Sequence, residues 1–371
     1  MHRALFVGTL LGAALLNAGC SESSSPASST FMPRPTYENR EPEGLTSRLS
    51  GFTVDPEAYF INLAHCAPPP AQCPLPPLFA EFSPLLQRSV VRGALVTLQD
   101  TVPDPVTGRP PDPAPPIPSD ARGLWTLPKV PTRKGAPFFV LSVGQGTLAN
   151  DVPPPFPLPP VAEGNYLPTL TIRPVVPAHS ACVGLEALQM SDKGVLEAVA
   201  KYLTAIDGAP VTVPDLLNPG RFGGITVFWL YRPGFPAFRV PAANTTVEAS
   251  SGRVLNIEWA PVGALPPPLA PFQSTRGFFI APTPPGGQPA PNSSLGLVAI
   301  VHPPLMGPPG TVTYTAKDAT TSVPDNRPWS LMPLALPQIP GLVTFAGLQM
   351  APAVPSTTPQ FPPPSTCLPG Q

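Results

Sequence analysis

Three histidines lie beyond the apolar N-terminal run, at His65, His179 and His302. A histidine acts as a general base when a serine or cysteine nucleophile lies within hydrogen-bond reach. Each of these has a proline or cysteine within three residues, and the sequence has no G-x-S-x-G, H-E-x-x-H, P-loop or G-x-G-x-x-G pattern. A Ser-His-Asp triad is defined by geometry rather than chain order, so that alternative stays open. We favour three loop or surface histidines and assign no catalytic residue.

Carboxylates gather in one Pro-rich stretch, at Asp100, Asp104, Asp112 and Asp120. Asp side chains in a loop can bind Ca²⁺. No D-x-D-x-D spacing supports this, and Asp is common in turns because it bonds nearby backbone N–H groups. A glycosidase needs two facing carboxylates, which nothing in the sequence places. We predict neither a metal nor a cofactor.

Four cysteines besides Cys20 are available for disulfides, namely Cys66, Cys73, Cys182 and Cys367. An even number in an exported chain indicates two bridges, with three possible connectivities. We favour Cys66–Cys73, which closes a short loop, and Cys182–Cys367, which closes a long one and would contribute about 4–5 kcal/mol in the chain-entropy model. Zinc is the alternative, since His65 and His179 lie close to cysteines, but paired C-x2-C knuckles are absent.

Four tryptophans could line a groove for a carbohydrate or a peptide: Trp125, Trp229, Trp259 and Trp329. Single tryptophans in strands more often lie in the core of a sandwich. We favour the core.

The composition excludes several classes of protein. Of 371 residues, 64 are Pro and 30 are Gly, charged residues make up 12%, and the net charge is −1. Without a basic surface, nucleic-acid binding is not expected. Abundant proline disfavours a mostly helical fold. A hydrophobic content of 42% with little charge is the opposite of a disordered composition.

The N-terminus predicts export. His2 and Arg3 precede an apolar run over residues 4–16, which is too short to span a bilayer. The following Ala18-Gly19-Cys20 resembles the bacterial lipoprotein signal, although Asn17 stands where that family prefers Leu. The resemblance implies cleavage after residue 19, lipidation of Cys20 (palmitate-type chains) and, from Ser21, an outer-membrane address. An ordinary secretory signal with an incidental cysteine is the alternative.

A β-sandwich module is predicted in the first half of the chain. Residues 89–143 resemble the carboxypeptidase regulatory-like (transthyretin-like) family through Gly93-Ala94-Leu95-Val96-Thr97-Leu98 and Asp120-Ala121-Arg122-Gly123-Leu124-Trp125-Thr126-Leu127. The resemblance implies a small sandwich without catalysis. A long Pro-rich insert between the two motifs departs from the family pattern.

The remaining pattern predicts a mainly β fold of one or two β-sandwich modules, with Pro-rich loops and one packed helix over about 191–206. Ser191 could cap that helix, Asp192 suits its first turn, and Gly208 follows its end. Apolar runs separated by Gly and Pro predict the strands. These are residues 58–63, 89–99, 124–127, 137–143, 166–173, 225–231, 245–249, 254–259, 277–281, 295–301, 311–316 and 342–348.

The predicted organisation is a signal peptide (1–19), a flexible tether (20–50), a sandwich module (51–175), a second mainly β region (176–350) and a Pro-rich tail (351–371). We predict a lipoprotein of the outer membrane or cell surface with a non-catalytic structural, adhesive or protein-binding role. Its partners would be the membrane, through Cys20, and other envelope proteins. The alternatives are a glycan or small-molecule binding lipoprotein and an accessory domain of an envelope hydrolase.

Overall fold

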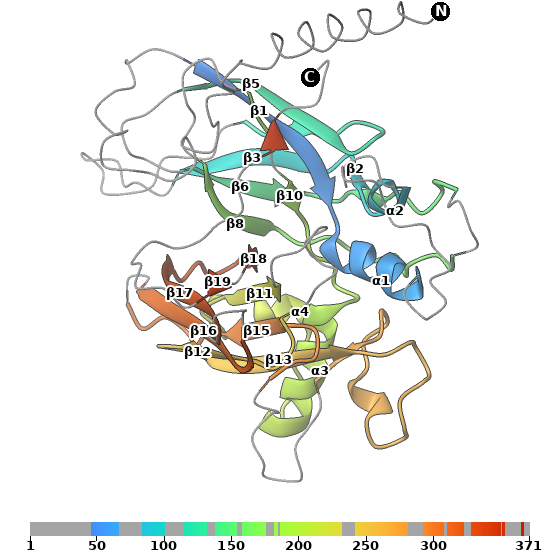
Figure 1. The fold of residues 1–371 in the computed structure, drawn as a ribbon, viewed down its shortest axis with the longest axis vertical. Helices are drawn as coiled ribbons and strands as arrows, with labels where there is room; N and C mark the ends of the chain where they lie inside the picture. Colours follow the sequence, from blue (N-terminus) through green and yellow to red (C-terminus); the bar gives the residue numbers. More distant parts are fainter. Residues whose placement is uncertain are drawn as a thin grey trace, which may run out of the picture.

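A nine-stranded sheet runs through the computed structural model (Figure 1). The structure describes residues 46–66, 84–100, 115–131, 138–153, 158–175, 182–184, 186–231, 242–280, 292–307, 310–322, 328–349, 351–352 and 365–366. Its longer strands are β1 (Thr46–Val54), β3 (Leu95–Asp100), β5 (Leu124–Pro131), β6 (Phe138–Val143), β8 (Thr169–Val175), β11 (Ile225–Tyr231), β12 (Thr245–Ala249), β13 (Arg253–Trp259), β15 (Leu297–Val301), β16 (Thr311–Ser322), β17 (Pro328–Pro337) and β18 (Val343–Gln349). The short ones are β2 (Val91–Arg92), β4 (Ile117–Pro118), β7 (Thr147–Leu148), β9 (Cys182–Gly184), β10 (Ala187–Leu188), β14 (Phe278–Phe279), β19 (Ala351–Pro352) and β20 (Ser365–Thr366).

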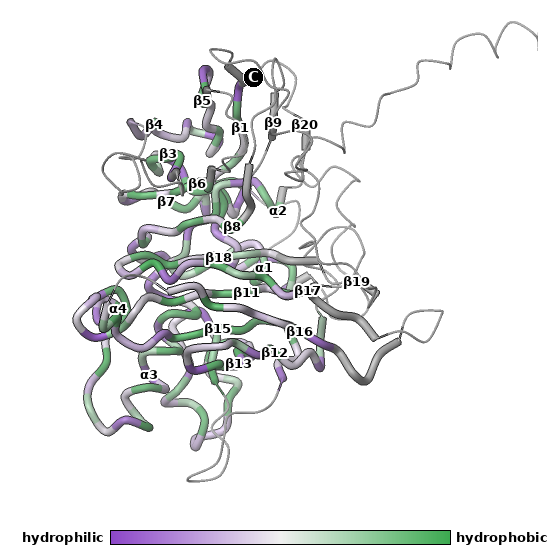
Figure 2. The backbone as a smooth tube through the Cα atoms, turned by 90° about the vertical axis from the view of Figure 1, so that its left-hand side faces the viewer, coloured by the Kyte–Doolittle hydropathy of each residue, from purple (hydrophilic) through white to green (hydrophobic). Residues whose placement is uncertain are grey.

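The order of strands in this sheet is β14-β13-β15-β11-β18-β8-β6-β3-β4, and Figure 2 shows the central strands following one another along the molecule. β18 runs parallel to both β11 and β8, while the other neighbours are antiparallel. Because β8 bonds directly to β18, one sheet takes strands from both sides of the boundary predicted at residue 175.

Helices and a second sheet cover one face of the nine-stranded sheet. The helices are α1 (Pro56–Cys66) and α3 (Val195–Asp207), with the short α2 (Pro84–Gln87) and α4 (Val213–Leu216) beside them. Alternate residues of the central strands, such as Val227 and Phe345, share an apolar core with α1 and α3. At the far end, β3 and β6 pack against the five-stranded sheet of β10, β1, β9, β20 and β5.

The opposite face carries the four-stranded sheet β12-β16-β17-β19. Phe228, Val298 and Ile300 of the large sheet form a second core with Val312 and Tyr314 of β16. The molecule is therefore a layered, mainly β structure, as the sequence predicts. Burial of apolar side chains between the layers, worth roughly 25 cal/mol per Å², stabilises this arrangement.

The strand predicted over residues 58–63 is wrong, because these residues form α1. Asp55 Oδ1 accepts the N–H of Ala58 at 2.9 Å, which caps the helix, and Pro56 suits its first turn. Ala58 and Asn62 are buried one helical turn apart. A mostly apolar run of six residues fits either period, and the signal that decides between them is the cap before it.

The predicted helix at 191–206 exists as α3, but it begins at Val195. Ser191 does not cap it: Gly194 occupies the N-cap and provides no side-chain hydrogen bond. The helix ends at Gly208, whose φ of 69° is the left-handed conformation expected at that position. The prediction of a single helix is also wrong, since α1 is a second one of comparable length.

Several strand predictions are confirmed, and others need correction. β11 has the predicted bounds, 225–231, and β12 likewise spans 245–249. The long strand predicted over 89–99 is split into β2 and β3, because Gly93 has a φ of 73° that extended backbone does not adopt. β1 starts at Thr46, inside the stretch predicted as tether, and β17 was not predicted.

Within the described ranges, no helix is both long and apolar enough to cross a membrane.

Candidate functional site: a groove beside helix α3

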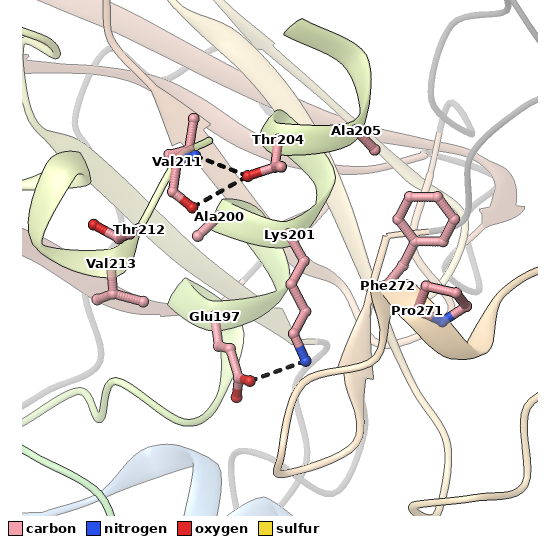
Figure 3. A pocket seen from close by; sticks show the side chains of 10 residues that line it. All are labelled: Glu197, Ala200, Lys201, Thr204, Ala205, Val211, Thr212, Val213, Pro271 and Phe272. Atoms are coloured by element: carbon pink, nitrogen blue, oxygen red, sulfur yellow. Dashed lines mark hydrogen bonds and ion pairs between the residues drawn. The ribbon is translucent and has the colours of Figure 1, made fainter. Parts of the chain in front are cut away.

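A groove of about 390 Å³ lies between α3, α4 and the 3₁₀ turn η4 (Ala270–Phe272) (Figure 3). Ala200, Lys201 and Ala205 contribute one wall from α3. Val211 and Val213 lie on the α4 side, and Pro271 and Phe272 close the groove from η4. The remaining lining residues are Glu197, Thr204 and Thr212.

A charged pair at the bottom of the view ties the groove walls together. Lys201 Nζ lies 2.9 Å from Glu197 Oε1 one helical turn earlier (Figure 3). Lys201 also donates to the backbone oxygen of Gln273 at 2.6 Å, and Glu197 accepts the N–H of Thr275 at 2.7 Å. Both charges therefore hold the η4 segment against α3.

The other polar side chains of the groove are also engaged. Thr204 Oγ1 accepts the N–H of Val211 at 2.8 Å (Figure 3). Thr212 begins α4 in a capping box with Asp215, and that interaction lowers the pKa of the Asp215 carboxyl. With its polar groups satisfied, the groove presents mainly methyl, ring and methylene surface. Its volume falls within the range of sites for small molecules, and its chemistry suits binding rather than proton transfer.

A buried ion cluster lies at the junction of α1, α3 and the segment after η4. Arg276 Nη1 donates to Asp55 Oδ2 at 2.7 Å and to Glu57 Oε2 at 2.9 Å, and all three side chains are 0% exposed. Arg276 Nε donates to the carbonyl of Ala162 at 2.9 Å, and the Tyr166 hydroxyl donates to Asp55 Oδ2 at 2.9 Å. One arginine thus joins its own segment to two others that are far apart in the sequence, residues 55–57 and 162–166.

Burial raises the pKa of the Glu57 carboxyl to about 7, with Arg276 opposing the shift and Asp55 adding to it. Burial alone would lower the pKa of Arg276, but the two carboxylates raise it above its usual value. Burial, and then the charge of Asp55, raise the pKa of Tyr166. Titratable groups of this kind mark catalytic sites when they line a cleft. Here solvent does not reach them, so the cluster is structural.

A second buried cluster surrounds His302. Its Nε2 lies 3.0 Å from Thr226 Oγ1 and 3.0 Å from the Tyr314 hydroxyl, between the two stacked sheets. Thr344 Oγ1 adds a hydrogen bond to Thr226 at 2.8 Å. Burial lowers the pKa of His302 to about 4 and raises that of Tyr314 to about 12. The imidazole is therefore neutral at physiological pH.

The histidine predictions have mixed outcomes. His302 follows the last residue of β15, so its predicted loop position is confirmed, but it is 1% exposed and a surface position is wrong. His65 lies in the last turn of α1, where its Nδ1 donates to the carbonyl of Ile61 at 2.8 Å. His179 lies outside the described residues. The structure does not bring His65 and His302 into one site.

Of the four carboxylates grouped in the sequence analysis, the structure describes two. Asp120 is described in full, and Asp100 only by its backbone in β3. Asp120 Oδ1 accepts the N–H groups of Arg122 and Leu124, a turn of the kind predicted. Asp104 and Asp112 lie outside the described residues. In the part of the chain that the structure describes, no group of three or more His, Cys, Asp or Glu side chains could hold a metal ion.

The cysteine pairs are described in part. Cys66 ends α1 and Cys182 begins β9, whereas Cys20, Cys73 and Cys367 lie outside the described residues. β20 pairs with β9 in antiparallel register, Ser365 opposite Gly184 and Thr366 opposite Val183. Both predicted disulfides stay predictions.

The core interpretation is confirmed for two tryptophans, since Trp125 and Trp229 are 2% and 1% exposed. Trp259 is half-buried and donates its indole N–H to the carbonyl of Arg276 at 2.9 Å. Trp329 is described only by its backbone in β17. Sequence reasoning did not identify Arg276, Asp55 or Glu57, because no motif or regular spacing links them.

No protein-family model matches the sequence, and no curated protein matches it. Among solved structures, the chain is similar to the TIE protein of Bacillus anthracis, at 9% identity and a TM-score of 0.19. That match covers 82% of this chain and 34% of the other, so the chain spans about a third of its length. The chain is also similar to GBS52, the minor pilin of Streptococcus agalactiae, at 10% identity and a TM-score of 0.19, over 85% of this chain and 99% of that one. Similarity this weak establishes neither a family nor a function.

Proposed function

We propose that this chain is a lipid-anchored, non-catalytic binding protein of the bacterial cell envelope. The observation that carries the proposal is that the polar groups described above are either buried or already paired. The titratable clusters around Arg276 and His302 are buried, and the charged pair of the groove, Glu197 and Lys201, is engaged with the backbone. The groove beside α3 is lined mainly by apolar surface, which suits binding.

The anchor in this proposal is Cys20, with its lipobox-like Ala18-Gly19 and the outer-membrane address suggested by Ser21. The likeness of residues 89–143 to a carboxypeptidase regulatory-like module belongs to the same proposal. It is supported by the shared core of Val96 in β3, Val140 in β6 and Trp125 in β5, which packs two sheets face to face. Such a module provides a rigid body without catalysis.

Cell fractionation tests the anchor and the location together. Cys20→Ala should move the protein out of the membrane fraction, and the N-terminal peptide of the native protein should carry acyl chains on Cys20 by mass spectrometry. Ser21→Ala is the matched control and should keep the lipid. An unmodified Cys20 in the native protein would refute the anchor. Protease added to intact cells then separates a surface role, in which the protein is digested, from a periplasm-facing scaffold, in which it survives until the outer membrane is opened.

A second candidate, binding of a small apolar ligand, is favoured by the groove itself. A fluorescent apolar probe such as anilinonaphthalene sulfonate should bind the native protein there. Ala205→Phe fills the groove from an exposed position of α3 and should reduce binding at least ten-fold. Ile206→Phe changes the next exposed residue, which does not line the groove, and should bind as the native protein does. Equal binding by both variants would exclude the groove.

A further inference from the structure

The segment between β13 and β14 contains an exposed loop without a polar side chain, here called the apolar loop (residues 260–272). Its sequence is Ala-Pro-Val-Gly-Ala-Leu-Pro-Pro-Pro-Leu-Ala-Pro-Phe. Figure 1 shows it as the orange loop with a short helical turn, projecting beyond β13 and α3. Val262 is 68% exposed, and Leu265, Leu269 and Phe272 are half-buried. Exposed apolar surface that is continuous in this way marks a contact with a partner or a membrane.

A buried glutamine gives the apolar loop a fixed shape. Gln273, 8% exposed, donates from Nε2 to the carbonyl oxygens of Ala260 at 2.9 Å and Pro261 at 3.2 Å. Its Oε1 accepts the N–H of Gly263 at 3.2 Å. The indole of Trp259 closes the base of the loop through its bond to Arg276. A loop that is already rigid loses little conformational entropy when it binds.

The backbone N–H groups of the apolar loop need few hydrogen bonds from water. Five of its thirteen residues are prolines, which have no N–H. Six of the other eight N–H groups bond within the loop or to its base, those of Ala260, Gly263, Ala264, Leu269, Ala270 and Phe272. Transfer of a backbone segment into an apolar medium is costly mainly through unsatisfied polar groups. The N–H groups of this loop avoid most of that cost, and its exposed carbonyl oxygens stay hydrated in the headgroup region of the bilayer.

The same features argue against a protein partner. Protein interfaces carry about one hydrogen bond per 100–200 Å², and the apolar loop offers no polar side chain and few free donors. A polyproline ligand is also a poor fit, because residues 267–272 form helical turns rather than an extended helix. From this chemistry we propose that the apolar loop inserts into the interfacial region of a lipid bilayer. The proposal uses the envelope location proposed above but not the lipid on Cys20.

The base of the apolar loop is close to electrically neutral. Lys201 is paired with Glu197, and Lys193 lies 3.8 Å from Asp192. Attraction to anionic headgroups is therefore not the driving force. We expect insertion into neutral phosphatidylcholine vesicles to match insertion into vesicles that contain phosphatidylglycerol, and to be independent of salt concentration.

Photo-crosslinking tests this contact in the full-length protein. A benzophenone amino acid replaces Val262 in one sample and Met306 in a control, since Met306 is 99% exposed on another loop. On phosphatidylcholine vesicles, the lipid adduct at position 262 should exceed that at position 306 at least ten-fold. The lipid on Cys20 and the apolar N-terminal run bring both positions near the bilayer, so the readout is the ratio of the two adducts. Equal adducts at both positions, or none at 262, would overturn the proposal.

Two further measurements sharpen the result. The double variant Leu265→Asp, Leu269→Asp should lower the lipid adduct at position 262 at least ten-fold. The comparison of positions 262 and 306 uses the otherwise native protein, so it does not depend on how the double variant folds. In cells that produce the protein, the adduct at 262 should be a phospholipid. A crosslink to a second polypeptide instead would overturn lipid insertion and identify the loop as a protein contact.

Discussion

Glu57 in the first turn of α1 caps the N-terminus of α3, because its Oε1 accepts the N–H of Val195 at 2.7 Å. The two residues are 138 positions apart. Glu57 supplies the cap that Gly194 cannot, and its negative charge is favourable at the positive end of the helix dipole. The other carboxylate oxygen bonds Arg276, so one side chain connects both helices to the ion cluster.

Arg276→Met should destabilise the protein strongly. The variant leaves Asp55 and Glu57 buried together without their cation, and losing one partner of a buried ion pair costs about 3–5 kcal/mol. Arg122→Met removes an exposed partner of Asp120 and should change the free energy of unfolding by less than about 1 kcal/mol. Urea denaturation of both variants measures the difference. A similar small effect for both would mean that the cluster is not buried in solution.

Gly194→Ala should disrupt the same junction by a steric route. A Cβ at this position would lie 1.8 Å from Glu57 Oε2, so the carboxylate would have to leave Arg276. We expect a loss on the order of 3 kcal/mol, in the range of a broken buried ionic network. Gly307→Ala is the control, because nothing lies within 4 Å of its added Cβ. Thermal unfolding measures the stability of both variants. Equal unfolding midpoints would contradict the close approach of Glu57 to position 194.

Glu57→Gln should change how stability depends on pH. The pKa of Glu57 is raised from 4.5 to about 7 in the folded protein, so the folded state binds a proton more tightly than the unfolded state. The contribution of this group is present below pH 4.5 and is lost as pH rises to 7, by about 3 kcal/mol. The glutamine variant lacks this loss, so its stability relative to the native protein should rise between pH 4.5 and 7. Parallel curves would refute the raised pKa.

His302→Gln should change the pH dependence of stability in the opposite direction. The folded state holds the pKa of His302 at about 4, below its usual 6.5, so the unfolded state binds the proton more tightly. Stability from this group is present above pH 6.5 and is lost as pH falls to 4, again by about 3 kcal/mol. Between pH 4.5 and 6.5, rising pH should therefore lower the stability contributed by Glu57 and raise the stability contributed by His302. Proton NMR of the imidazole checks the value directly, and a midpoint near 6.5 would contradict it.

Peptide mapping tests the predicted disulfide pairing. β20 pairs with β9, the strand that Cys182 begins, with Thr366 opposite Val183. Non-reducing peptide mapping should therefore find Cys182 joined to Cys367. Removing both should cost about 4–5 kcal/mol, against about 2–3 kcal/mol for removing Cys66 and Cys73, because the closed loop is much longer. A link from Cys182 to Cys66 or Cys73 would refute the pairing.

The spacing of apolar residues was sufficient to predict secondary structure where a single helical or strand period dominates a segment. The β-branched and aromatic run of β11 has the bounds expected from sequence, and the apolar face of α3 is present from Val195 onward. It failed at α1, where Asp55 and Pro56 mark a helix start and the apolar run fits either structure. The ion cluster could not be predicted, since Asp55 and Arg276 are 221 positions apart and only the tertiary fold joins them. The apolar loop was not identified from the sequence, because a run of proline and apolar residues does not show whether it is exposed.

The position of β18 also determines when the nine-stranded sheet can form during synthesis. This strand, near the C-terminal end of the described chain, lies between β11 and β8 in the centre of the large sheet. During synthesis the middle of that sheet stays open until residue 349 has emerged, whatever local structure forms earlier. Pairings between segments so distant in sequence make folding slow. A chain whose sheet cannot close early stays unfolded while it is synthesised, which suits the export that we propose.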